Sequence, residues 1–188
     1  DSSTESREYF ELMISELDRA NDIITEFLSL ARVNPISLER RNLNEVIKRL
    51  YPLIHSDGIS RDKAIELKLN PVPDLNINVK EISQLILNMV RNGLDAMEDY
   101  GVLTIETRTT GKHVVLSIKD QGCGISKEFI AKLGTPFFTT KANGTGLGLA
   151  VCYGIAERHN ATIEVKSGAE GTVFSISFPV DQANSNQG

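Results

Sequence analysis

The stretch that decides the fold is GTPFFTTKANGTGLGLA, residues 134–150, in which three glycines recur at every second position. A Walker-type phosphate loop places Lys and Ser or Thr directly after its last glycine, whereas here Leu149 follows Gly148 and Lys141 precedes the glycines. A dinucleotide-binding fingerprint needs a glycine three positions after Gly146, where this sequence again has Leu149. The spacing therefore excludes both of these loops and leaves the role of the glycines open.

The same stretch has the composition of a phosphate-binding lid. Its glycines lead directly into an apolar helical pattern, so free amide groups at the helix start are able to hold phosphate oxygens. The residues between Gly124 and Gly144 show little apolar periodicity, which is typical of a mobile lid, and Phe137 and Phe138 are its expected anchors. Taken alone, such a loop is more often an ordinary turn. The candidate phosphate-binding residues are Thr139, Thr140, Lys141, Gly144, Gly146 and Gly148.

A second stretch, QLILNMVRNGLDAM at residues 84–97, predicts a helix with an unusual polar face. Asn88 and Asn92 lie four positions apart on one side, although asparagine is a poor former of helix interiors. Amide oxygens are suitable ligands for Mg²⁺, which takes the rest of its shell from water and phosphate. A solvated polar face explains this stretch equally well when it is taken alone. The predicted buried stripe is Ile82, Leu85, Ile86, Met89, Gly93 and Ala96, and Gln84 and Asp95 share the polar face.

A third stretch, VVLSIKDQGCGI at residues 114–125, predicts a half-buried strand that delivers Asp120 to its end. A carboxylate there can accept a hydrogen bond from the exocyclic amine of adenine, whereas guanine would present an oxygen and be repelled. Gly122 and Gly124 would let the backbone approach a flat ring. A lone Asp-Gln-Gly segment is more often a simple turn, so this stretch also needs support from the others.

Size and composition limit the function classes. The 188 residues are 40% apolar and 24% charged, as expected for one globular domain with room for an extra element. The net charge of −5 argues against a nucleic-acid partner, and no apolar run approaches the roughly 18 residues of a membrane span. Cys123 and Cys152 are too isolated for a metal cage, and we expect reduced thiols. Because the chain starts at Asp1 without a signal-like stretch, we expect a cytoplasmic piece of a longer protein that could be membrane-anchored elsewhere.

The periodicities predict an α+β architecture, a mixed sheet covered on one face by helices and preceded by one long helix over 5–32. The long helix has coiled-coil spacing and is expected to pack against another helix, although it could instead lie on its own domain. Asn44 is the expected N-cap of a helix over 44–54. Further helices are predicted at 80–98, 126–133 and 146–159, strands at 38–42, 64–69, 75–79, 101–109, 113–119, 161–167 and 172–178, and disorder at 181–188.

In chain order, these stretches resemble the motifs of the histidine protein kinase family, within the superfamily of gyrase, the heat-shock 90 chaperone and the mismatch-repair clamp. NMVRNGLDAM is similar to the N box, DQGCGI to the first glycine box, PFFTTK to the F box and GTGLGLA to the second glycine box. GTVFSISFP, residues 171–179, resembles the closing strand, and the form of the F box is most similar to nitrogen-regulation and sporulation sensor kinases. The resemblance covers residues 37–180 and implies a two-layer α/β sandwich of the Bergerat type.

The resemblance also implies the cofactors ATP and Mg²⁺ and a role for each motif. Asn88 and Asn92 would bind the magnesium-phosphate group, Asp120 would recognise adenine, and Thr172 would lie near the adenine pocket. Relatives that hydrolyse ATP have a glutamate at position 88, and because an amide cannot act as a general base, hydrolysis is expected to be slow. The implied nucleotide-binding residues are Asn88, Asn92, Asp95, Asp120, Gly122, Gly124, Ile125, Thr139, Lys141, Gly144, Thr145, Gly146, Leu147, Gly148 and Thr172.

For the whole protein the resemblance implies a kinase that phosphorylates a histidine and feeds a response-regulator receiver domain. None of His55, His113 and His159 lies in the family's phosphoacceptor motif, so the acceptor is expected outside this chain. Residues 1–33 resemble the second helix of a dimerisation hairpin, which implies a homodimer. Two alternatives stay open: a serine/threonine kinase of the anti-sigma type, and a nucleotide-gated binding module without catalysis.

Overall fold

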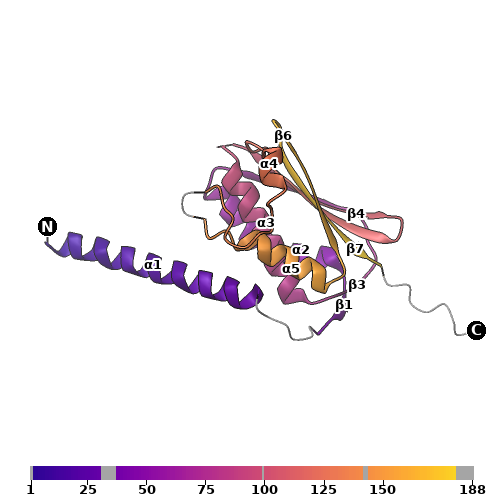
Figure 1. Ribbon diagram of the computed structural model, residues 1–188, viewed down its shortest axis with the longest axis horizontal. Helices are drawn as coiled ribbons and strands as arrows, with labels where there is room; N and C mark the ends of the chain where they lie inside the picture. The colour runs from indigo at the N-terminus through magenta and orange to yellow at the C-terminus, as the bar shows by residue number, and fades with distance from the viewer. Residues whose placement is uncertain (1, 31–36, 99, 142–143, 181–188) are drawn as a thin grey trace, which may run out of the picture.

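The computed structural model describes residues 2–30, 37–98, 100–141 and 144–180. Over these ranges the chain forms helices and a mixed sheet, as the sequence predicts for an α+β fold (Figure 1). The helices are α1 (Ser2–Leu30), α2 (Leu43–Ile59), α3 (Val79–Ala96), α4 (Lys127–Ile130) and α5 (Gly148–Arg158). The strands are β1 (Glu39–Arg41), β2 (Ala64–Leu69), β3 (Leu75–Ile77), β4 (Val102–Thr110), β5 (His113–Lys119), β6 (Thr162–Gly168) and β7 (Gly171–Pro179).

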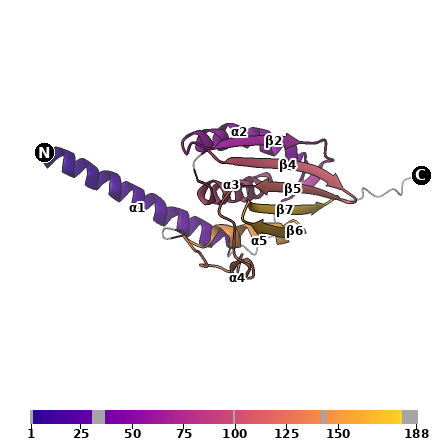
Figure 2. The ribbon, with the colours of Figure 1, turned by 90° about the horizontal axis from the view of Figure 1, so that it is seen from above.

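The main sheet has five strands in the order β2-β4-β5-β7-β6, which can be followed from one edge to the other in Figure 2. The β2–β4 pair is parallel, and the other three pairs are antiparallel. A parallel pair cannot be joined by a tight turn, and here β3 and α3 lie in the connection between the two strands. β1 and β3 form a separate antiparallel pair. The sheet is therefore mixed, and the antiparallel pairing of β5 with β7 brings the end of β5 next to the start of β7.

The core lies on the face of the sheet that carries α2, α3 and α5. Along β7 every second residue is buried, and the residues between them, such as Ser175, stay partly exposed. Period-two alternation places these buried side chains on one face, where the apolar stripes of the helices cover them. The buried set includes Leu103, Ile105, Leu116, Ile118, Phe174, Ile176 and Phe178 from the sheet, and Leu85, Ile86, Met89, Val151 and Ile155 from α3 and α5.

The start of α2 differs from the sequence prediction. Asn42, not Asn44, is the N-cap, and its Oδ1 accepts a hydrogen bond of 3.1 Å from the N–H of Asn44. Asn44 instead donates through Nδ2 to the carbonyl of Asn70 and accepts through Oδ1 from the hydroxyl of Thr107. The prediction was wrong because neighbouring asparagines have the same capping propensity, and only the contact with β4 assigns their roles.

The ends of other elements differ from the predictions for local reasons. α2 continues through Pro52 to Ile59, because Ile54 and Gly58 are buried beyond the proline. β3 is shorter than predicted, because Asn78 ends it and caps α3, with its Oδ1 accepting from the N–H of Glu81. α5 begins later than predicted, because Gly146 has φ +69° and cannot belong to a right-handed helix.

α1 extends away from the sheet layers, and its C-terminal end lies near α5 (Figures 1 and 2). Large apolar side chains along it are exposed, among them Phe10 at 64% and Leu17 at 69%. Residues 31–32 of the predicted helix and the predicted disordered segment 181–188 lie outside the described residues, and coiled-coil pairing stays a prediction. No helix within the described ranges combines the length and apolar character needed to cross a membrane.

His159 joins the end of α5 to the start of α3. Its Nδ1 lies 2.8 Å from the carbonyl oxygen of Ile155, and its Nε2 accepts a hydrogen bond of 3.0 Å from the N–H of Asn78. These partners require a neutral ring that carries its proton on Nδ1. Burial lowers the pKa of His159 and outweighs the opposing effect of the nearby Glu81 carboxylate. The imidazole thus lies at the C-terminal end of α5 and acts as a neutral connector.

This connector predicts an acid-dependent loss of stability. The pKa of His159 is lowered from 6.5 in the folded chain, so the unfolded chain takes up the proton first as the pH falls. The free energy of unfolding should therefore fall below about pH 6.5, by at most about 1.4 kcal/mol per pH unit for one proton. Urea unfolding between pH 5.5 and 7.5 measures this slope. His159→Gln should flatten it, whereas His113→Gln, at an exposed site, should not; equal slopes in all three chains would contradict the assignment.

Candidate functional site

A cleft of about 490 Å³ lies between α3, the segment before α5, and the adjoining ends of β5 and β7. The polar face of α3 forms one wall, and residues of the ranges 138–141 and 144–148 form another. The cleft is lined by Asn88, Arg91, Asn92, Asp95, Ala96, Asp120, Cys123, Gly124, Ile125, Phe129, Leu133, Phe138, Thr139, Thr140, Lys141, Gly144, Thr145, Gly146, Gly148, Leu149, Thr172 and Phe174.

The cleft brings together most of the residues that the sequence predicted for a nucleotide site. Gly122 and Leu147 are the two that do not line it. Leu147 is fully buried in the core, and a Cβ at Gly122 would lie only 2.5 Å from the carbonyl oxygen of Ala96. These two residues therefore pack behind the lining of the cleft and do not face it. The predicted residues that do line the cleft are Asn88, Asn92, Asp95, Asp120, Gly124, Ile125, Thr139, Thr140, Lys141, Gly144, Thr145, Gly146, Gly148 and Thr172.

Asp120 is held at the floor of the cleft by two backbone groups. Its Oδ1 accepts hydrogen bonds from the N–H of Gly122 at 2.9 Å and the N–H of Thr172 at 3.0 Å. Burial raises the pKa of this carboxyl, and the two backbone donors partly offset that effect. Oδ2 accepts no hydrogen bond from the residues that the structure describes. One oxygen therefore fixes the side chain, and the other can accept a hydrogen bond from a ligand in the cleft.

The backbone around Asp120 can adopt this conformation only because glycines occupy two tightly packed positions near it. Gly171 has φ +117°, and a Cβ there would overlap the carbonyl oxygen of Asp120. Gly124 has φ +74°, and its Cβ would overlap the carbonyl oxygen of Gly168. The hairpin of β6 and β7 thus packs directly on the turn that follows β5. The sequence analysis predicted a role for Gly124 but none for Gly171.

The polar face of α3 aims two amide groups at the second wall. The Nδ2 of Asn88 donates to the carbonyl of Gly148 at 3.2 Å, at the first residue of α5. The Oδ1 of Asn92 accepts from the Nζ of Lys141 at 3.2 Å. Both amides therefore have partners on the second wall, and their role in ligand binding stays a prediction.

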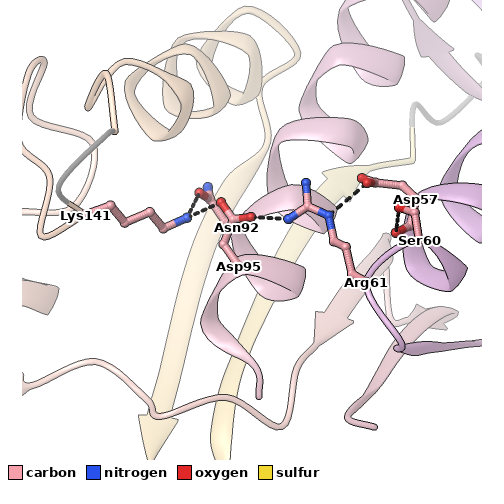
Figure 3. A network of polar contacts seen from close by, with 6 residues as sticks. All are labelled: Asp57, Ser60, Arg61, Asn92, Asp95 and Lys141. Carbon is pink, nitrogen blue, oxygen red and sulfur yellow. Dashed lines mark hydrogen bonds and ion pairs between the residues drawn. The ribbon is translucent and has the colours of Figure 1, made fainter. Parts of the chain in front are cut away.

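A chain of charged side chains runs from Asp95 and Lys141, which line the cleft, to Arg61 and Asp57, which do not (Figure 3). The Nζ of Lys141 lies 2.7 Å from Oδ2 of Asp95, and Nη1 of Arg61 lies 2.5 Å from Oδ1 of the same carboxylate. Arg61 also donates through Nε to Asp57 at 2.9 Å. Burial raises the pKa of Asp95, but the hydrogen bonds and charges of Lys141 and Arg61 outweigh it and lower that pKa below its usual range. Asp95 is therefore an anion shared between two cations.

The segment before α5 is folded by glycine and aromatic contacts. A Cβ at Gly146 would lie 2.5 Å from the carbonyl carbon of Phe137, so only glycine fits this approach. Phe138 packs against Phe129 of α4, with ring centroids 5.8 Å apart. Phe137 is 64% exposed, so of the two expected anchors only Phe138 holds the segment. α5 then starts without a side-chain cap, which leaves its first amide groups available to a ligand.

Several residues of the cleft were not predicted from the sequence. Arg91 is the most informative, because it adds a cation three positions after Asn88 on the same helix. That spacing was a usable signal. Phe129 and Phe174 give the cleft an apolar wall together with the expected anchor Phe138, but no local pattern separated Phe129 and Phe174 from ordinary core residues.

Comparison with known sequences places the cleft in a family. Residues 77–182 match the family described as histidine kinase-, DNA gyrase B-, and HSP90-like ATPase. Sporulation kinase C of Bacillus subtilis (strain 168) is 34% identical over 177 residues, 93% of this chain and 41% of the relative. Sensor histidine kinase ZraS of Escherichia coli (strain K12) is 33% identical over 179 residues, 94% of this chain and 38% of the relative. The chain thus spans about two fifths of the length of these relatives.

Solved structures agree with this placement. The catalytic domain of histidine kinase ThkA matches with a TM-score of 0.71 and 28% identity, over 77% of this chain and 97% of that domain. Histidine kinase ThkA in complex with response regulator protein TrrA matches with a TM-score of 0.78 and 26% identity, over 92% of this chain and 51% of that one. The family match covers more than half of the chain and includes every residue of the cleft. The chain therefore belongs to the histidine kinase-, DNA gyrase B-, and HSP90-like ATPase family and carries a catalytic ATPase domain of the sensor histidine kinase type.

Proposed function

We propose that this chain is the ATP-binding catalytic region of a two-component sensor histidine kinase. It transfers the γ-phosphoryl group of ATP to a histidine outside these 188 residues, for relay to an aspartate of a response regulator. The observation that carries the proposal is that Asp120, the two amides of α3 and the ammonium of Lys141 line one cleft. These groups suit the purine and the phosphates of one nucleotide.

The adenine end of the proposed site is Asp120. Its Oδ2 would accept a hydrogen bond from the exocyclic amine, while its Oδ1 stays bound to the N–H groups of Gly122 and Thr172. Gly124, Ile125 and the apolar wall of the cleft would pack against the ring. Because Oδ2 can only accept while the carboxylate is ionised, the site selects adenine over guanine.

The phosphate end is formed by α3 and the segment before α5. Asn88 donates through Nδ2 to Gly148, which leaves its Oδ1 without a hydrogen bond from the described residues and suited to a hard cation. Asn88 and Asn92 would hold Mg²⁺, which when bound neutralises phosphate charge. Lys141, the amide groups at the start of α5, and the hydroxyls of Thr139 and Thr145 would bind the phosphate oxygens. The described residues contain no cluster of His, Cys, Asp and Glu that could hold a metal alone.

The domain's contribution to transfer is positioning and charge neutralisation, since Asn88 cannot activate water as a base. We further propose that residues 37–180 form the catalytic domain and that 1–33 form the second helix of a dimerisation hairpin. The exposed apolar residues of α1, among them Phe10, Met13, Leu17, Ile24 and Phe27, support this, because such a row needs a partner helix. The whole protein is then a homodimer that meets a receiver domain.

The proposal is tested by supplying the missing acceptor. Mixing the chain with magnesium ATP and a separate helical hairpin that carries a histidine should give labelled phosphate on the hairpin. Phosphohistidine is lost in acid and stable in base, so the label should disappear on acid treatment. The same hairpin with its histidine replaced by glutamine should stay unlabelled. Acid-stable phosphate on serine or threonine, or ATP binding without transfer to any acceptor, would overturn the kinase assignment.

A further inference from the structure

Arg61 lies just beyond the end of α2, outside every motif of the sequence, and contacts Asp95, a lining residue of the cleft (Figure 3). We infer that Arg61 is a positioning residue: it holds the carboxylate of Asp95 in the orientation that binds the ammonium of Lys141. The inference deepens the proposed function, because Lys141 is the cation that we assign to the phosphates. Its test needs no nucleotide.

The two cations bind different oxygens of one carboxylate. Nη1 of Arg61 donates a hydrogen bond to Oδ1 of Asp95, and Nζ of Lys141 donates one to Oδ2 at 2.7 Å. A carboxylate held at one oxygen by a planar guanidinium has little freedom to rotate, so its second oxygen points in a fixed direction. Lys141 therefore meets an oriented acceptor, with the amide oxygen of Asn92 as a further partner at 3.2 Å.

The guanidinium of Arg61 has a second partner besides Asp95. Its Nε donates to Oδ1 of Asp57, four residues earlier on α2, at 2.9 Å. The contacts thus run from α2 through Arg61 and Asp95 of α3 to the segment 134–141, which we name the lysine segment. About a third of each of the Arg61 and Asp95 side chains is exposed, so solvent screens the attraction and the arrangement acts mainly by orientation.

The backbone of the lysine segment offers a direct readout. The N–H of Lys141 donates to Oγ1 of Thr139 at 3.1 Å, and the N–H of Phe138 donates to the carbonyl of Thr135 at 3.2 Å. If Asp95 holds the side chain of Lys141, these amides should exchange more slowly than their own turn hydrogen bonds alone would allow. Losing the oriented carboxylate should expose them more often.

Hydrogen–deuterium exchange of the chain in buffer without nucleotide tests the inference. In Arg61→Gln the amides of residues 138–141 should exchange about two- to fivefold faster, the range expected for a partly exposed ion pair. Asp95→Asn should give a similar increase, and the double variant should exchange no faster than the faster single variant. Arg61→Lys keeps the charge but lacks the planar group that reaches Asp57 and Asp95 together, so it should restore little of the protection. The matched control is Arg41→Gln, which breaks an exposed pair with Glu39 and should leave the lysine segment unchanged.

The inference is overturned if Arg61→Gln leaves exchange of the lysine segment unchanged, or if the effects of Arg61→Gln and Asp95→Asn add. It is also overturned if exchange rises equally across β4 and β5, because Arg61 would then stabilise the whole domain. A chain that fails to bind ATP but shows the expected exchange pattern would overturn the proposed function and leave the role of Arg61 standing. The two failures are therefore distinguishable.

Discussion

Asp120→Asn should weaken ATP binding about ten- to a hundredfold, equivalent to roughly 1.5–3 kcal/mol for a hydrogen bond to a charged group. Asparagine keeps the size of the side chain, and its carbonyl can stand at Oδ1 and accept from the N–H groups of Gly122 and Thr172. The amide nitrogen then takes the place of Oδ2 and offers a donor where the adenine amine also donates. Titration calorimetry with magnesium ATP measures the loss.

Two comparisons make the result specific. Asp62→Asn changes an exposed carboxylate at a position with φ +55°, which asparagine tolerates, and should leave ATP affinity unchanged. GTP presents an acceptor in place of the amine, so its weak binding should not suffer from Asp120→Asn. Unchanged ATP affinity in a folded Asp120→Asn chain would remove the adenine assignment.

Gly171→Ala should destabilise the domain by about 2–4 kcal/mol, which is large for the addition of one methyl group. The backbone at Gly171 has φ +117°, and the added Cβ would overlap the carbonyl oxygen of Asp120. Relief requires the β6–β7 hairpin to move away from the end of β5, and this pulls the N–H of Thr172 from Asp120. ATP affinity should therefore fall together with stability. Urea unfolding gives the first quantity and calorimetry the second.

The matched control lies in the same hairpin. Gly168 pairs with Gly171 across the turn, and a Cβ there would meet no atom within 4 Å. Gly168→Ala should therefore change the free energy of unfolding by less than about 0.5 kcal/mol. Equal stability losses in the two variants would show that hairpin composition, and not the contact with Asp120, sets the effect. A destabilised Gly171→Ala chain with normal ATP affinity would separate Asp120 from the hairpin.

Much of the fold followed from local patterns. The strands at 64–69 and 113–119 have the predicted bounds, because alternating apolar residues between turn residues identify a half-buried strand. The three polar stretches were also predicted to share a site, and one cleft contains residues of all three. Their order along the chain carried this prediction, since each stretch alone fitted an ordinary turn or a solvated face.

What could not be predicted depends on contacts between distant parts of the chain. In the sequence, Gly171 does not differ from an ordinary hairpin glycine, and only the folded chain shows that it packs against the carbonyl of Asp120. Arg61 follows a helix end, where a cation needs no explanation, and only the folded chain places it on Asp95. The choice between Asn42 and Asn44 as N-cap likewise rests on Thr107, far along the chain. Propensity ranks residues at a position but does not identify their distant partners.

The bond between Asp120 and Thr172 joins residues 52 positions apart and has a consequence for biosynthesis. A chain growing on the ribosome presents the amides of α3 and the carboxylate of Asp120 long before β7 has been made. Until β7 leaves the exit tunnel and pairs with β5, the N–H of Thr172 cannot hold Asp120, and the nascent domain should not bind ATP at the proposed site. Nucleotide capture would then mark the completion of translation of this domain.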